Sequence, residues 1–160
     1  MLGTAWCRPP RHEPRVHVIL TRQGKDTVRI DAPVRAFRCS GPHGQIRGGI
    51  LLQGVNGGNG VVVWLRTADS LTIGTWPLLQ RGDTLTPRGA TVGVRFMLAD
   101  AARGAPLDSG TVWVTRADSV VALVARGTGG ETLTATRMAV EATFDAVPVG
   151  VDTVSCRSQL

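Results

Sequence analysis

The sequence predicts an all-β protein built from two packed antiparallel sheets, a β-sandwich. Its apolar residues are mainly valine, alanine, leucine and isoleucine, tyrosine is absent, and glycine and threonine are abundant. This composition favours strands and turns over helices. Short runs of alternating apolar and polar residues follow one another, separated by Gly, Asp, Asn and Pro. The apolar spacing of an amphipathic helix persists nowhere in the chain.

The 160 residues are expected to form one domain after a short lead-in. Residues 1–14 hold Pro9, Pro10 and Pro14 among charged residues, which indicates a flexible or polyproline-like segment. The domain is expected to span residues 15–160. A chain of this size buries roughly 70% of the surface that its unfolded form exposes. Folding is therefore expected to need no metal or cofactor.

About ten runs show the alternation of apolar and polar residues that is expected of strands. They cover residues 15–22, 26–31, 33–39, 46–55, 60–67, 70–76, 91–98, 110–116, 119–126 and 132–147. About ten short strands with turn signals between them suggest a two-sheet sandwich, immunoglobulin-like or jelly-roll in general shape.

Three connections are assigned from their turn residues. Gly57 and Gly58, in the stretch VNGGNG between two apolar runs, are predicted to form a hairpin loop in which glycine and asparagine supply positive φ. The stretch MLADAARGAP at 97–106 is the one candidate helix, and we interpret it as a turn. The tripeptide RGD at 81–83 is familiar from integrin recognition, and we interpret it as a turn between strands.

Nearly the same residues occur twice, as VVWLRTADSLT at 62–72 and as TVWVTRADSVV at 111–121. In each copy a strand that carries a tryptophan is followed by Ala-Asp-Ser, and an apolar run comes next. Asp and Ser side chains readily bond to their own backbone in turns. We therefore interpret both copies as hairpins of the fold and not as an active-site motif used twice.

The positive charge is concentrated at the start of the chain. Residues 1–50 hold nine Lys and Arg against three Asp and Glu, which accounts for the whole net charge of +6. Such a region would suit nucleic acid or another polyanion. In TVRID and PVRAFRC, however, arginine alternates with apolar residues as on the solvated face of a strand, and no series of aromatic residues is interleaved. We therefore expect no nucleic-acid partner.

The three cysteines are Cys7, Cys39 and Cys156, so at least one of them has no intramolecular partner. We favour a disulfide between Cys39 and Cys156, which would tie the end of the chain to an early strand. A disulfide implies an oxidising compartment. The alternative, three reduced thiols in a cytoplasmic protein, stays open, as does the partner of Cys7.

The start of the chain, MLGTAWCRPPRHEP, is too short and too polar for a signal peptide, but it resembles the end of one. We expect an extracytoplasmic protein, periplasmic or secreted, whose leader is absent from the given sequence. No segment has the roughly 18 consecutive apolar residues that a membrane-spanning helix needs.

Two tryptophans are the candidate binding residues. Trp64 shares a strand face with Val62 and Arg66, and Trp113 shares one with Thr111 and Thr115. Both rings are thus predicted on the more polar side of their strands. An exposed indole on a flat sheet can stack on a sugar ring or contact a peptide or partner subunit. The alternative is that loops or the N-terminal lead-in cover the rings.

The stretch FRCSGPHGQIRGGILL at 37–52 resembles the copper-ligand loop of cupredoxins. The resemblance implies a copper site in which Cys39 supplies a thiolate and His43 an imidazole, with His17 as a possible second imidazole. The sequence has no methionine after His43, where that family has its axial ligand. We therefore expect no metal and favour a disulfide-bonded Cys39.

The stretch PLDSGTVWV at 106–114 resembles the catalytic turn of aspartic proteases. The resemblance implies a dimer in which Asp108 of each chain shares one proton, with Ser109 and Gly110 completing the turn. We find no apolar-apolar-Gly segment downstream of the kind that this family packs behind the aspartate loop. The favoured interpretation is a turn that opens a strand.

Together these observations predict a non-catalytic module with a binding or structural role and no cofactor. Its ligand is expected to be a surface partner or a glycan, and its oligomeric state stays open. The composition resembles that of secreted bacterial modules rich in Thr, Gly and Val, and no motif assigns the chain to one family.

Overall fold

The structure, a computed structural model, describes residues 11–40 and 46–156 and contains nine strands within these ranges. In chain order they are β1 Arg15–Arg22, β2 Thr27–Ser40, β3 Ile46–Asn56, β4 Asn59–Arg66, β5 Gly74–Pro77, β6 Gly89–Leu98, β7 Ala101–Ala117, β8 Val120–Gly130 and β9 Arg137–Val154. The prediction of an all-β protein is confirmed.

The prediction of a two-sheet sandwich is wrong, because eight of the strands close into an antiparallel barrel. Around the barrel the order is β7-β6-β4-β3-β2-β1-β9-β8, and β8 pairs back with β7. Each barrel strand therefore lies beside its neighbours in the sequence, as in an up-and-down barrel. The ninth strand, β5, pairs with the edge of β7 opposite to β8 and is not part of the ring.

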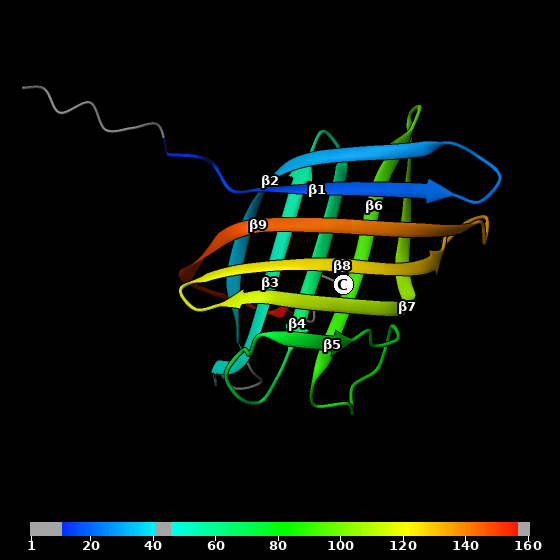
Figure 1. Cartoon of the computed structure of the whole chain (residues 1–160). Coiled ribbons are helices and arrows are strands. Elements are labelled where there is room, and N and C mark those ends of the chain that lie inside the picture. Colours follow the sequence, from blue (N-terminus) through cyan, green and yellow to red (C-terminus); the bar gives the residue numbers. More distant parts are fainter. Residues whose placement is uncertain (1–10, 41–45, 157–160) are drawn as a thin grey trace, which may run out of the picture.

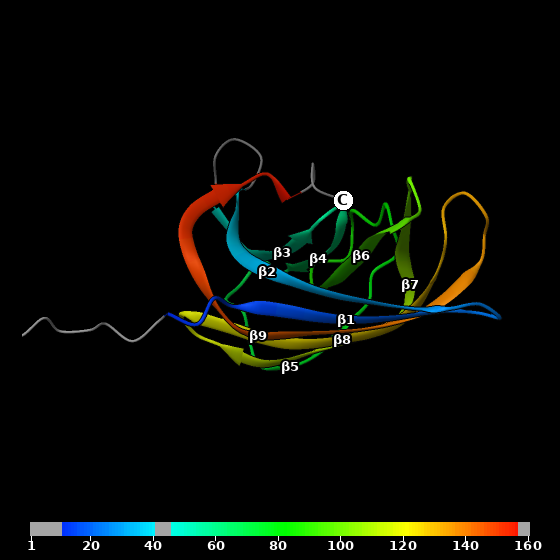
Figure 2. The ribbon, with the colours of Figure 1, turned by 90° about the horizontal axis from the view of Figure 1, so that it is seen from above.

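Two crossing layers are visible in Figure 1, and long strands that belong to both layers join them. The first half of β2 pairs with β1, and its second half, Val34–Ser40, pairs with β3. β7 likewise pairs with β6 through its first half and with β8 through its second. β9 pairs with β1, bends near Ala146, and then runs parallel to the second half of β2. Figure 2 shows β2 and β9 curving from one layer to the other, so that the two layers join at this corner.

Glycines permit the bend in β7. At Gly110 φ is +138°, and a Cβ there would lie 2.1 Å from the carbonyl oxygen of Arg126 in β8. A Cβ at Gly127 would lie 2.4 Å from the carbonyl oxygen of Ser109. The two strands thus approach more closely than side chains allow, at a register shift between Leu107 and Ser109.

Several strands differ in extent from the sequence-based prediction. The runs at 26–31 and 33–39 form one continuous strand, β2. The stretch 97–106 is not mainly a turn, because β7 already begins at Ala101 and only the residues around Ala99, which has positive φ, reverse the chain. Gly104 and Pro106 concealed this half of the strand, since both residue types are rare in strands.

The hairpin at Gly57 and Gly58 is confirmed, and both glycines have positive φ. Of the two Ala-Asp-Ser copies, only 117–119 forms a hairpin, in which Asp118 accepts a hydrogen bond from the amide of Val120 at 2.8 Å. After the copy at 68–70 the chain continues to β5, which pairs with β7 and not with β4.

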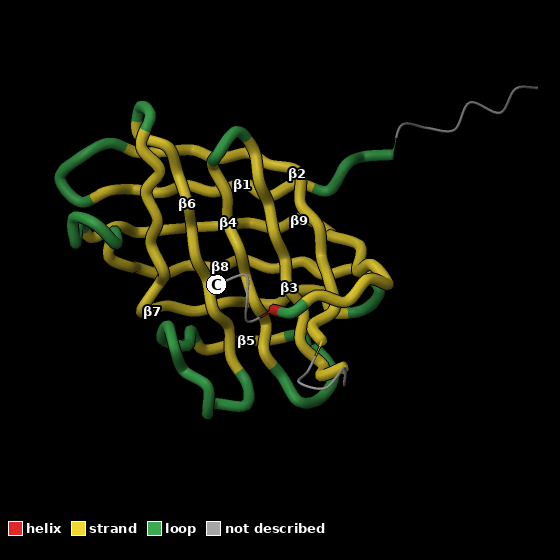
Figure 3. The backbone as a smooth tube through the Cα atoms, turned by 180° about the vertical axis from the view of Figure 1, so that it is seen from behind, coloured by secondary structure: helices red, strands yellow, loops and turns green. Residues whose placement is uncertain are grey.

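Side chains fill the barrel interior, the largest being those of Trp76, Phe96 and Phe144. One end of the barrel is closed by buried charges. The fully buried carboxylate of Glu131 lies 3.1 Å from Arg22 and 3.4 Å from Arg103. The other end carries the connections between β4 and β5 and between β7 and β8. Figure 3 shows the strands of the two layers crossing over the interior.

Candidate functional site

The outer face of the sheet formed by β5, β7, β8, β9 and β1 carries the most exposed tryptophan of the described residues. Cross-strand pairing puts its outward side chains in rows. We call this surface the Trp113 face. One row holds Thr75, Trp113, Val124, Thr143 and His17, and the next holds Thr111, Arg126, Glu141 and Ile19.

Trp113 is 38% exposed and Ile19 is 39% exposed. The guanidinium of Arg126 lies 5.7 Å from the centre of the Trp113 ring. Its Nε donates a hydrogen bond to the Glu141 carboxylate at 2.7 Å. The arrangement therefore combines an apolar ring with a charged donor and a charged acceptor.

A shallow depression of about 550 Å³ lies on this face. Trp113, Ile19 and the Arg126–Glu141 pair line it, together with the hydroxyl residues Thr21, Thr111 and Thr128. Alternation alone places Arg126 and Glu141 outward, but their contact depends on the register between β8 and β9, which the sequence does not reveal. The pairing of a tryptophan with these two charges was therefore missed at the level of sequence.

His17 lies on the same sheet face, between two carboxylates. Its Nδ1 is 3.0 Å from Asp31 and its Nε2 is 3.6 Å from Asp145. His43, its proposed partner in a copper site, lies outside the described residues, as does Cys7. Within the described ranges no group of three or more His, Cys, Asp and Glu side chains has an arrangement that could hold a metal ion.

Trp64 has a different environment from Trp113. It is partly buried in a small apolar cluster on the outside of β2, β3 and β4, together with Leu51, Phe37 and the two sulfurs of Cys39 and Cys156. The indole nitrogen of Trp64 is buried and has no hydrogen-bond partner among the described residues. The ring is thus less accessible to a ligand than that of Trp113.

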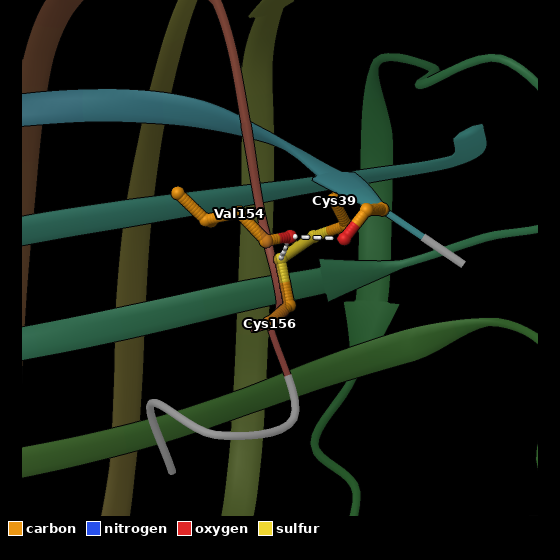
Figure 4. Close-up of a disulfide and its surroundings, with 4 residues drawn as sticks. Cys39, Val154 and Cys156 are labelled. Atoms are coloured by element: carbon orange, nitrogen blue, oxygen red, sulfur yellow. Dashed lines mark hydrogen bonds between the residues drawn. A yellow bond between two sulfur atoms is a disulfide. The ribbon is translucent and has the colours of Figure 1, made fainter. Parts of the chain in front are cut away.

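The cover over this cluster is the end of the described chain, which a disulfide between Cys39 and Cys156 holds in place. Figure 4 shows the bridge beside Val154. The hydroxyl of Ser40 donates a hydrogen bond to the carbonyl of Val154 at 3.0 Å. A sulfur in a disulfide cannot act as a copper thiolate. The bridge is compatible with an extracytoplasmic location.

Asp108 lies in β7 and forms an ion pair with Arg137, which donates from Nη2 at 2.9 Å. The pKa of the Asp108 carboxyl lies below its ordinary value, mainly because Arg137 hydrogen-bonds to the charged form. The shared proton of an aspartic-protease pair requires one carboxyl with a raised pKa. The observed environment instead favours the charged form.

The RGD tripeptide lies between β5 and β6, and the side chain of its aspartate is hydrogen-bonded within its own loop. The Asp83 carboxylate accepts hydrogen bonds from the Thr86 hydroxyl at 2.6 Å and from the amides of Leu85 and Thr86 at 2.9 Å. Arg66 donates a further bond at 3.1 Å. These bonds, that from the Thr86 hydroxyl foremost, lower the pKa of Asp83 to about 2.

No protein-family model, curated protein or solved structure matches the chain. Among the described residues there is no helix that has the length and apolar character to cross a membrane.

Proposed function

We propose that the protein is a non-catalytic, extracytoplasmic carbohydrate-binding module that uses the Trp113 face. The exposed indole of Trp113 at the edge of a shallow depression carries the proposal. An indole ring offers a flat apolar surface to the C–H face of a sugar ring. Arg126 and Glu141 beside it supply a donor and an acceptor for sugar hydroxyls, and the surrounding threonines supply further hydroxyl groups.

A sugar fits this face better than an extended peptide does. A peptide that adds a strand needs an unpaired sheet edge, and barrel closure leaves β5 as the edge strand within the described ranges. That edge is short and ends at Pro77, and the Arg88 guanidinium lies near its Thr75 carbonyl, at 3.4 Å. The proposed ligand therefore contacts side chains of the sheet face and not its backbone.

The test is retention of the wild-type protein on a panel of immobilised polysaccharides such as cellulose, chitin and xylan. We expect Trp113→Ala to weaken binding by at least about tenfold, as is usual for a central aromatic contact. Trp113→Phe should retain part of the binding. The matched control is Val55→Ala, which removes an apolar side chain that is 54% exposed on β3, a strand that does not belong to the sheet of the Trp113 face.

Equal retention of wild type and Trp113→Ala, with both folded by circular dichroism, would contradict the proposal. So would an absence of wild-type binding across a broad glycan array. The compartment is tested separately, by export of the full chain and disulfide mapping without reduction, in which a free Cys39 would count against an extracytoplasmic site.

A further inference from the structure

The two Ala-Asp-Ser copies meet at the open end of the barrel. A cavity of about 500 Å³ lies there, lined by residues 68–70 of one copy and by Ala117 and Asp118 of the other. In Figure 1 the turn between β7 and β8 and the loop from β4 to β5 lie at the same end of the barrel. We call this cavity the barrel mouth. Its volume is in the range of small-molecule sites, which often occur in the mouths of β-barrels.

The floor of the barrel mouth is apolar. Ile50 and Val121 lie beneath it in the main core, and they are too deeply buried to offer a ligand much surface themselves. Leu71 and Val149 line it as well, pack against that core and stay partly exposed toward the cavity. A ligand in the mouth therefore has an apolar surface available for a hydrocarbon group.

The rim of the barrel mouth carries two opposite charges without partners. Neither the guanidinium of Arg38 nor the carboxylate of Asp69 makes an ion pair or side-chain hydrogen bond with any residue of the described ranges, and both line the cavity. Asp118 differs, because its carboxylate accepts from the Val120 amide at 2.8 Å and from Arg116 at 3.1 Å. One positive and one negative group are thus free at the rim.

We propose that the barrel mouth binds a small zwitterion with an apolar body, of the class of short apolar peptides. Arg38 binds the ligand's carboxylate, for which a guanidinium is suited because it donates two parallel hydrogen bonds. Asp69 binds the ammonium group, and the ligand's apolar side chains contact Leu71 and Val149, the partly exposed apolar residues of the mouth. A ligand with only one charge would leave the other rim group without a partner.

The experiment is isothermal titration of the full-length oxidised protein with L-leucyl-L-leucine as the probe. Two derivatives separate the charges: the N-acetyl form lacks the ammonium group, and the C-terminal amide lacks the carboxylate. We expect wild type to bind the free dipeptide roughly ten- to a hundredfold more tightly than either derivative, the usual effect of losing a hydrogen-bonded charge.

Two variants assign the roles of the rim groups. Arg38→Gln should lose affinity for the free dipeptide and no longer distinguish it from the amide, and Asp69→Asn should no longer distinguish it from the N-acetyl form. The matched control is Arg35→Gln, an exposed arginine of the same strand that does not line the mouth.

Either of two results overturns the proposal: no heat of binding with wild type up to millimolar dipeptide, or the same affinity in wild type, Arg38→Gln and Asp69→Asn. Circular dichroism of each variant excludes unfolding as the cause of a loss. Because the Trp113 face lies on the outer sheet surface, Trp113→Ala should leave dipeptide binding unchanged.

Discussion

Removing the disulfide between Cys39 and Cys156 should cost the protein a large part of its stability. The bridge joins residues 117 positions apart. In the chain-entropy model, a loop of this length restricts the unfolded chain enough to contribute about 5 kcal/mol to the free energy of unfolding at 25 °C. Because net stabilities of domains are about 5–15 kcal/mol, this is a substantial fraction.

The structure indicates why the measured loss should be somewhat smaller. Without the bridge, the segment from Val154 to Cys156 can detach from Trp64 and Leu51 while the barrel stays closed. The native state then also gains freedom, which offsets part of the loss in the unfolded state. We therefore expect a loss of about 3–5 kcal/mol.

The assay is equilibrium unfolding in urea, followed by tryptophan fluorescence, for oxidised wild type and for a double variant with Cys39→Ser and Cys156→Ser. Wild type kept reduced is the control, since it lacks the bridge but has no buried serine. Both forms without the bridge should have a lower midpoint, and the slope against urea should rise because their unfolded chains expose more surface. A loss below about 1 kcal/mol in both would refute the loop-closure argument.

Three further changes test the remaining parts of the fold. Glu131→Gln should lower the free energy of unfolding by about 3 kcal/mol, because Arg22 and Arg103 lose their buried counter-charge; an unchanged urea midpoint would show that water compensates these charges. Gly110→Ala should cost about 2–4 kcal/mol, since its Cβ would lie 2.1 Å from a carbonyl oxygen of β8, and a variant as stable as wild type in thermal unfolding would mean that the strands can separate there at little cost. The pKa of Asp83, lowered to about 2 from 3.8, implies stability that is present above about pH 4 and lost as the pH falls through about 2; Asp83→Asn should flatten this acid limb in urea titrations at several pH values, and an unaltered limb would assign it to other groups.

Much of the local structure could be predicted from the residues themselves. The alternation in 15–22 and 119–126 corresponds to β1 and β8, and the glycines of VNGGNG form the hairpin between β3 and β4. These features depend on the preferences of single residues and of their near neighbours. They do not depend on which strand lies alongside.

The candidate sites were less predictable, because they depend on register between distant strands. Arg126 and Glu141 are 15 positions apart and meet only because β8 pairs with β9 in one register. Arg38 and Asp69 come to the same cavity from β2 and from the loop after β4. Composition and spacing carry no direct signal for either arrangement.

The two tryptophans show which properties the sequence determines and which depend on the tertiary structure. The sequence by itself determined that Trp64 and Trp113 both lie on outward faces of β-strands, since alternation assigns sides. It left open whether the strands form a sandwich or a barrel, because both use the same alternation. Only the tertiary structure decided that β8 pairs with β7 to close the ring, and that the segment tethered to Cys39 partly covers Trp64 while Trp113 stays exposed. The physical reason is that the burial of a side chain depends on what packs against it. The residues that cover Trp64 are held there by Cys39, from which they are more than a hundred positions away along the chain.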